Sequence, residues 1–167
     1  MASPLLEGTW SQPCQNASLN QEAFSGNQVT LTENHFEDAQ CQRGVLIFSD
    51  KGTYVVNGRH MDFSFAQVSI TLQIQTLVDD FNQRQVCGFQ DWQLGQEKAI
   101  TGLKCALFTN TQSVQVPAVG DQRFGIYKID EEKEGDRLFL GRLTPGHDAL
   151  SPEKRPLEFD PQFYLRQ

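Results

Sequence analysis

Four cysteines are the residues of this sequence best suited to covalent or metal chemistry. They are Cys14, Cys41, Cys87 and Cys105, and no two of them form a C-x-x-C pair. The three histidines are scattered without H-x-x-x-H spacing, so the closely spaced ligands typical of a structural zinc site are missing. An even number of widely spaced cysteines instead favours two disulfides. The sequence therefore predicts no metal and no other cofactor.

Four cysteines allow three pairings, and the sequence alone does not choose among them. We favour Cys14–Cys41 with Cys87–Cys105, because pairing neighbours along the chain closes two modest loops. Each such loop is worth roughly 3 kcal/mol in the chain-entropy model. Disulfides persist in oxidising compartments, so we expect an extracytoplasmic protein that is secreted, periplasmic or lipid-anchored. The competing interpretation is a cytosolic protein with four reduced, buried cysteines.

The sequence contains few residue patterns that are typical of catalytic sites. The sequence has no G-x-S-x-G elbow, no Gly-rich phosphate loop and no H-E-x-x-H. Oxidised cysteines leave no thiolate nucleophile. His35 stands near three acidic residues, Glu33, Glu37 and Asp38, but the cluster lies next to a turn and is expected to be solvated. We predict no catalytic residue and no enzymatic activity.

Length and composition indicate one globular domain. The chain has 167 residues, of which 38% are hydrophobic, and a formal net charge of −7; such a charge argues against binding nucleic acid. The longest apolar runs are four residues, such as 45–48, too short to span a bilayer. Residues 1–20 lack the basic and apolar regions of a signal peptide. We therefore expect a mature or trimmed form whose residues 1–5 are a linker.

The periodicity is that of an all-β protein with about eight to ten short strands. Alternating runs over 28–32 and 45–56 lead into Asn57-Gly58, a strong hairpin signal. Over 62–78 the apolar residues change from odd to even positions near Ala66-Gln67, and such a change of strand face requires a turn or a bulge. The residues on either side of the flip are Phe63 and Phe65, then Val68, Ile70, Leu72 and Ile74.

Three further segments complete the expected organisation. Residues 77–83 have the spacing of one or two helical turns, and the acidic link 130–136 is expected to be an exposed hairpin tip. Residues 144–167 contain four prolines, which indicate an extended segment. The same segment carries several large apolar side chains, so we expect it to pack on the body. Strands at this spacing are typical of an antiparallel barrel or sandwich.

Several motifs together resemble a known superfamily. They are Gly8-x-Trp10, Phe36-x-Asp38-x-x-Cys41, Gly52-x-Tyr54 and Cys87-Gly88-x-x-x-Trp92-x-x-Gly95. The first resembles the opening signature of lipocalins and other calycins. The series, from about Leu6 to Leu143, resembles the lipocalin-like domain of the adenomatosis polyposis coli down-regulated Wnt inhibitors, and bacterial lipocalin-like lipoproteins. The sequence lacks the Thr-Asp-Tyr signature of lipocalins, and three arginines compete to pack on the tryptophan: Arg123, Arg137 and Arg142.

The resemblance implies an up-and-down, lipocalin-like β-barrel over 6–143, with Gly8 and Trp10 at its base; residues 144–167 are then the extended segment that packs on the barrel. It further implies an interior that binds a small hydrophobic ligand or lipid chain, or the acyl chain of a lipidated protein. The expected ligand-binding residues are Phe48, Tyr54, Phe63, Phe65, Ile70 and Leu72. The alternative is a solid barrel that binds or inhibits another protein through its surface and its C-terminal tail.

Overall fold

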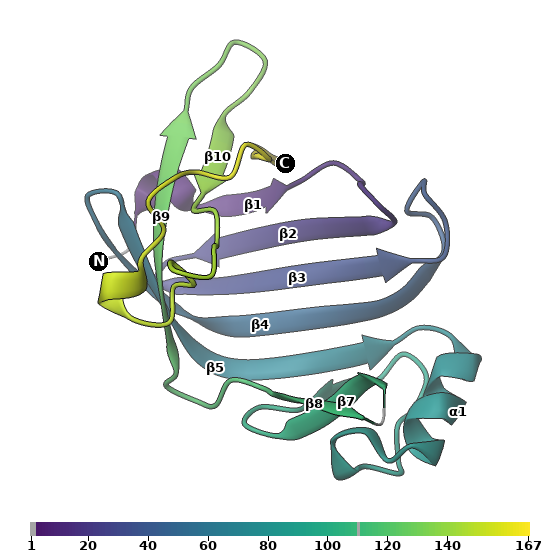
Figure 1. The fold of residues 1–167 in the computed structure, drawn as a ribbon. Coiled ribbons are helices and arrows are strands. Elements are labelled where there is room, and N and C mark those ends of the chain that lie inside the picture. The colour runs from purple at the N-terminus through teal and green to yellow at the C-terminus, as the bar shows by residue number, and fades with distance from the viewer. Residues whose placement is uncertain (1–2, 110) are drawn as a thin grey trace.

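Eight antiparallel strands close into a barrel in the computed structural model, which describes residues 3–109 and 111–167 (Figure 1). Pairing runs from β1 in order through β5, passes to β9, β10 and β11, and returns from β11 to β1. This confirms the predicted all-β antiparallel barrel with one short helix. The strands are β1 (Gly8–Ser11), β2 (Ser18–Ser25), β3 (Gln28–Phe36), β4 (Gly44–Asn57), β5 (His60–Leu72), β9 (Gln122–Asp130), β10 (Arg137–Leu140) and β11 (Tyr164–Arg166).

The predicted irregularity in β5 is a β-bulge. Gly52 of β4 pairs with Phe65, whereas the preceding β4 residue pairs with Gln67, so Ala66 has no partner of its own. This extra residue shifts the side-chain alternation, and apolar side chains on both sides of it face the interior: Phe63, Phe65, Val68, Ile70 and Leu72. Only glycine fits at position 52, because a Cβ there would lie 2.0 Å from the Ser64 carbonyl oxygen.

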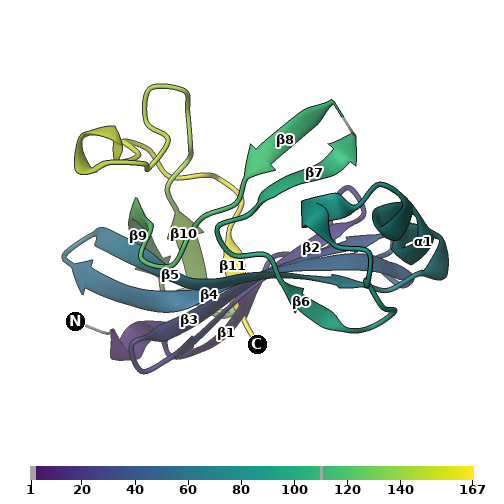
Figure 2. The same ribbon diagram turned by 90° about the horizontal axis from the view of Figure 1, so that it is seen from below.

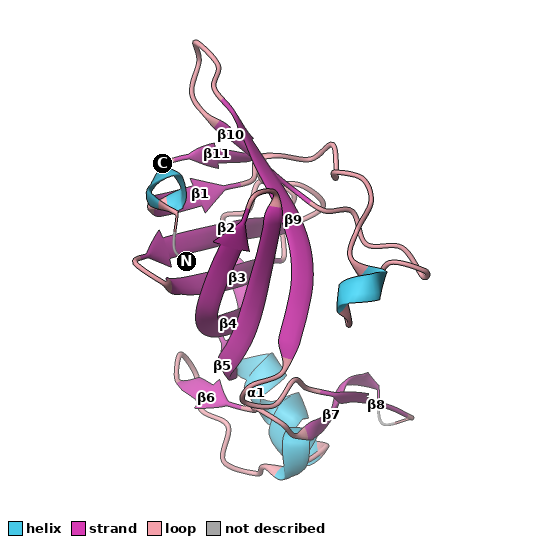
Figure 3. Cartoon of the chain, turned by 90° about the vertical axis from the view of Figure 1, so that its left-hand side faces the viewer, coloured by secondary structure: helices cyan, strands magenta, loops and turns pink. Residues whose placement is uncertain are grey.

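The chain between β5 and β9, residues 73–121, forms a cap beside the C-terminal end of β5 (Figures 2 and 3). It contains the predicted helix, α1 (Gln75–Gln83), followed by η2 (Val86–Gly88), β6 (Glu97–Ala99) and the hairpin of β7 (Lys104–Thr109) and β8 (Gln112–Gln115). Phe81 of α1 packs edge-on against Trp92 at 5.2 Å between ring centroids. The predicted Cys87–Cys105 disulfide ties η2 to β7. The cap thereby covers a second apolar core that includes Ile70 and Leu72.

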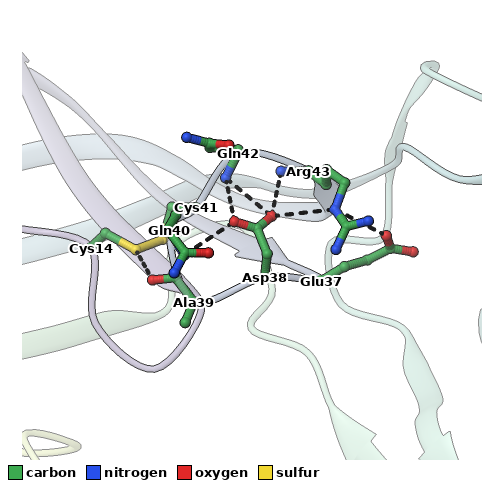
Figure 4. Close-up of polar contacts among 8 residues, drawn as sticks. All are labelled: Cys14, Glu37, Asp38, Ala39, Gln40, Cys41, Gln42 and Arg43. Atoms are coloured by element: carbon green, nitrogen blue, oxygen red, sulfur yellow. Dashed lines mark hydrogen bonds and ion pairs between the residues drawn. A yellow bond between two sulfur atoms is a disulfide. The ribbon is translucent and has the colours of Figure 1, made fainter.

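The predicted Cys14–Cys41 disulfide joins the β1–β2 and β3–β4 loops (Figure 4). Within the second loop, the Asp38 carboxylate accepts hydrogen bonds from the backbone N–H groups of Gln40, Gln42 and Arg43. The Arg43 amide is the closest, at 2.7 Å, and these bonds hold the pKa of Asp38 below its usual value. Asp38 therefore fixes the conformation of the loop that carries Cys41, which accounts for its place in the motif Phe36-x-Asp38-x-x-Cys41.

The base of the barrel is organised around Trp10, which is fully buried. Its indole N–H donates to the Leu6 carbonyl in the short 3₁₀ helix Pro4–Leu6. The guanidinium that covers its ring, 4.2 Å from the centroid, belongs to Arg166. None of the three arginines expected there occupies this position. Arg166 also donates to the carbonyls of Leu5 and Glu7, at 2.8 and 2.7 Å.

The C-terminal segment differs from the expectation. It was predicted to pack outside a barrel that ends at residue 143, but Tyr164–Arg166 is itself a barrel strand, paired with β1 and β10. A strand of three residues that follows a proline-rich segment is too short for its alternation to be recognised. The preceding residues 141–163, which we call the strap, run along β9, where Arg155 donates to the Gly125 carbonyl at 2.6 Å. Arg155 also pairs with Asp62 of the neighbouring β5 at 2.6 Å. The acidic link is the β9–β10 turn, as predicted.

We expect Arg166→Met to lower the free energy of unfolding by roughly 2–4 kcal/mol, because it removes a cation–π contact and two charge-assisted hydrogen bonds. Urea denaturation measures this loss. Arg142→Met is the matched control, since Arg142 forms an exposed ion pair with Glu158 and such pairs are worth about 0–1 kcal/mol. Equal losses in the two variants would contradict the role given to Arg166.

Candidate ligand-binding cavity

A cavity of about 330 Å³ lies inside the barrel and continues under the strap. Its wall is formed mainly by apolar side chains of β2 to β5, β9 and β10: Phe24, Val29, Leu31, Tyr54, Met61, Phe63, Phe65, Ile126 and Leu140. The strap contributes Leu143, Asp148, Ala149 and Pro156. A cavity of this size and lining suits one small, largely apolar molecule.

A second, more polar cavity of about 170 Å³ adjoins the first. Glu22, Leu31 and Asp50 line both cavities, so these three side chains mark the boundary between them. The remaining lining of the smaller cavity is mostly polar and consists of Asn20, Gln21, Thr32, Glu33, Phe48 and Tyr164. The interior is thus apolar towards the base and polar beyond the boundary.

The boundary residues occupy one rung of the barrel. Glu22 of β2 pairs with Leu31 of β3, and Leu31 pairs with Asp50 of β4. Paired residues of neighbouring strands point to the same face, and the strands are ~4.8 Å apart. The two carboxyl groups therefore enter the interior from the same face of β2 and β4, with Leu31 between them, on strands about 9.6 Å apart.

Burial changes the ionisation of both acids. Glu22 is only 2% exposed, and desolvation raises its pKa to about 8. No hydrogen bond or ion pair reaches its carboxyl group from the rest of the described chain. Desolvation also raises the pKa of Asp50 to about 6, against the opposing effect of Arg123. At neutral pH, Glu22 is mostly protonated and Asp50 mostly ionised.

Arg123 provides the positive charge in the lining of the larger cavity. It lies on β9, where it pairs in register with Phe63 of β5. Its guanidinium covers the Phe65 ring at 5.0 Å and donates to the Gln122 carbonyl at 2.9 Å. Arg123 therefore stacks on the wall of the cavity and acts on Asp50 as a nearby charge.

The sequence-predicted residues fall into three groups. Tyr54, Phe63 and Phe65 line the larger cavity, and Phe48 lines the smaller one. Ile70 and Leu72 are fully buried beneath the cap and line neither cavity. Gly8 and Trp10 lie at the base, where Gly8 has a φ of +110°.

Neither lumen carboxyl is among the residues predicted from the sequence to bind a ligand. Asp50 lies between Ser49 and Lys51, and Glu22 ends the polar run Asn20-Gln21-Glu22, patterns that usually indicate a solvent-facing strand side. The alternation along β2 could have identified Glu22, because residues two apart in a strand face the same side and Phe24 faces the interior. Arg123 was considered only as a partner for the base tryptophan. His35 pairs with Glu33 at 2.9 Å near the rim of the smaller cavity.

Comparison with protein-family models gives no match, and comparison with curated proteins gives none either. Within the described residues, no group of three or more histidine, cysteine or acidic side chains is arranged to hold a metal ion.

The raised pKa of Glu22 predicts that stability depends on pH. A proton binds the folded carboxyl more tightly than the unfolded one, so stability falls as pH rises from about 4.5 through about 8. Glu22→Gln removes this loss. We expect the variant to gain a few kcal/mol relative to the parent between pH 5 and pH 8, measured by urea denaturation at each pH.

Glu134→Gln, at the exposed β9–β10 turn, is the control and should follow the parent at both pH values. A parent whose stability relative to Glu22→Gln stays constant or improves towards pH 8 would show that the Glu22 pKa is not raised.

Proposed function

We propose that this protein binds one small hydrophobic ligand, or an acyl chain, inside its barrel and releases it unchanged. The observation that carries the proposal is the cavity of about 330 Å³ with a mainly apolar wall, inside a closed barrel of eight strands. Apolar ligands gain about 25 cal/mol for each Å² of surface removed from water, so a cavity of this kind provides affinity without a covalent step. The bound molecule could equally be the lipid chain of a modified protein.

The same proposal places the protein with the lipocalin-like barrels and outside the cytoplasm. Trp10 at the base, covered by an arginine of the last strand, supports the kinship. Two disulfides support an oxidising compartment. Among the described residues, no helix has the length and apolar character to cross a membrane.

The alternative of a solid barrel acting through its tail receives less support. That function needs a filled interior and a tail free to engage a partner. The cavity argues against the first condition. The pairing of Tyr164–Arg166 with both neighbouring strands argues against the second, because a partner could draw the tail away only by opening the barrel.

Uptake of the neutral apolar dye N-phenyl-1-naphthylamine tests the proposal. We expect saturable fluorescence enhancement with one dye bound per chain, displaced by 1-octanol. Leu31→Trp adds bulk at the boundary of the two cavities and should weaken dye binding about tenfold or more, a loss of roughly 1.4 kcal/mol.

Ala23→Trp is the matched control, because Ala23 follows Glu22 in β2 but is exposed on the outer face. It should bind the dye like the parent. Failure of the parent to take up either dye or 1-octanol would refute the proposed function.

A further inference from the structure

We propose that the ligand carries a protonated amine beside its apolar body, and that Glu22 and Asp50 hold this ammonium group at the boundary of the two cavities. The inference rests on the proposed function and narrows it to basic amphiphiles. Its basis is that the fold places hydrogen-bond acceptors of Glu22 and Asn20 in the interior of the barrel without hydrogen-bond donors from the described part of the chain beside them.

The first observation is the unmatched set of acceptors. Glu22 is 98% removed from solvent, at 2% exposure, and lines both cavities with no partner among the described residues. The Asn20 side-chain oxygen is buried without a hydrogen bond, and Asn20 lines the smaller cavity. Buried acceptors left unpaired are costly. A ligand that brings several N–H donors removes this cost, and an ammonium group offers up to three.

The second observation is the sign of the charge. Three carboxyl groups line the larger cavity, those of Glu22, Asp50 and Asp148, against the single guanidinium of Arg123. Asp148 already accepts from the Leu150 amide and lies 3.8 Å from the Lys154 ammonium. Arg123 is engaged with Phe65 and the Gln122 carbonyl. The two carboxyls without such partners are therefore those on the shared rung.

The third observation is the distribution of polarity along the lumen. The apolar wall lies on the base side of the rung and the polar lining lies beyond it. A molecule with an apolar body and a charged end matches this division when its body occupies the larger cavity. Its ammonium group then meets Glu22 and Asp50 where the two cavities join.

Binding of the ammonium is coupled to proton release. The buried Glu22 is mostly protonated at neutral pH, and an adjacent positive charge favours its ionised form. Affinity for the amine is therefore expected to rise from pH 5 to pH 8. The other groups that face the rung are Glu33 from β3, Arg123 from β9, Tyr164 from β11 and Asp148 from the strap.

Three probes of equal chain length test the inference by isothermal titration calorimetry at pH 8. They are octylamine, 1-octanol and octanoate. We expect octylamine to bind about tenfold or more tightly than either of the others, as one charge-assisted hydrogen bond can provide. Its affinity should fall on moving to pH 5, whereas that of 1-octanol should not change.

Glu22→Gln and Asp50→Asn should each reduce octylamine affinity about tenfold and thereby remove its advantage over 1-octanol. A cooperative urea transition of each variant shows that it is folded. Glu134→Gln is the control and should behave like the parent. If 1-octanol or octanoate binds as tightly as octylamine, or if Glu22→Gln keeps the preference for the amine, the inference is wrong while the proposed function stands. If none of the three probes binds, the proposed function fails as well.

Discussion

Closure of the barrel by β11 is the constraint on which the rest of the structure depends. This strand of three residues fills the space between β1 and β10, and without it both neighbours would present open edges. Arg166 fixes the closure by covering Trp10 and by binding the carbonyls of Leu5 and Glu7. Its ion pair with Asp136 extends the same anchor to the β9–β10 turn. The C-terminus, the N-terminal 3₁₀ helix and a distant hairpin are thereby held by one side chain.

A closed ring determines what the interior can contain. Bulky side chains fill the base around Trp10 and the region beneath the cap around Trp92. Between these two cores the interior is left with space and with two carboxyl groups. A pair of acids in a desolvated position costs stability, and apolar residues of similar size would fill the site at lower cost. The binding role proposed for Glu22 and Asp50 agrees with the general observation that unfavourable local choices cluster at functional sites.

The parts of the fold with strong local patterns could be predicted from the sequence. Alternation and turn residues predicted a barrel or sandwich, one short helix and a turn or bulge near Ala66-Gln67. The resemblance to lipocalins selected the barrel, and the cysteine spacing favoured the two disulfides that the structure contains. The eighth strand could not be predicted, because three residues after a proline-rich segment carry too little alternation, and its pairing with β1 is decided by contacts across the whole chain. The lumen acids were not predicted because polar strand residues usually face solvent, and the alternation of Glu22 with Phe24 is the one local sign of its inward face. Arg166 likewise acquires its role from where β11 lies.

The ionisation of Glu22 is the most direct measure of whether the lumen is built for a basic ligand. Carbon-13 NMR of the labelled side-chain carboxyl, titrated with and without saturating octylamine, reports this pKa. We expect the pKa of Glu22 to be raised by burial to about 8 in the free protein, and to decrease when the amine is bound. A carboxyl whose pKa is ordinary in the free protein, or does not change with octylamine bound, would contradict the account.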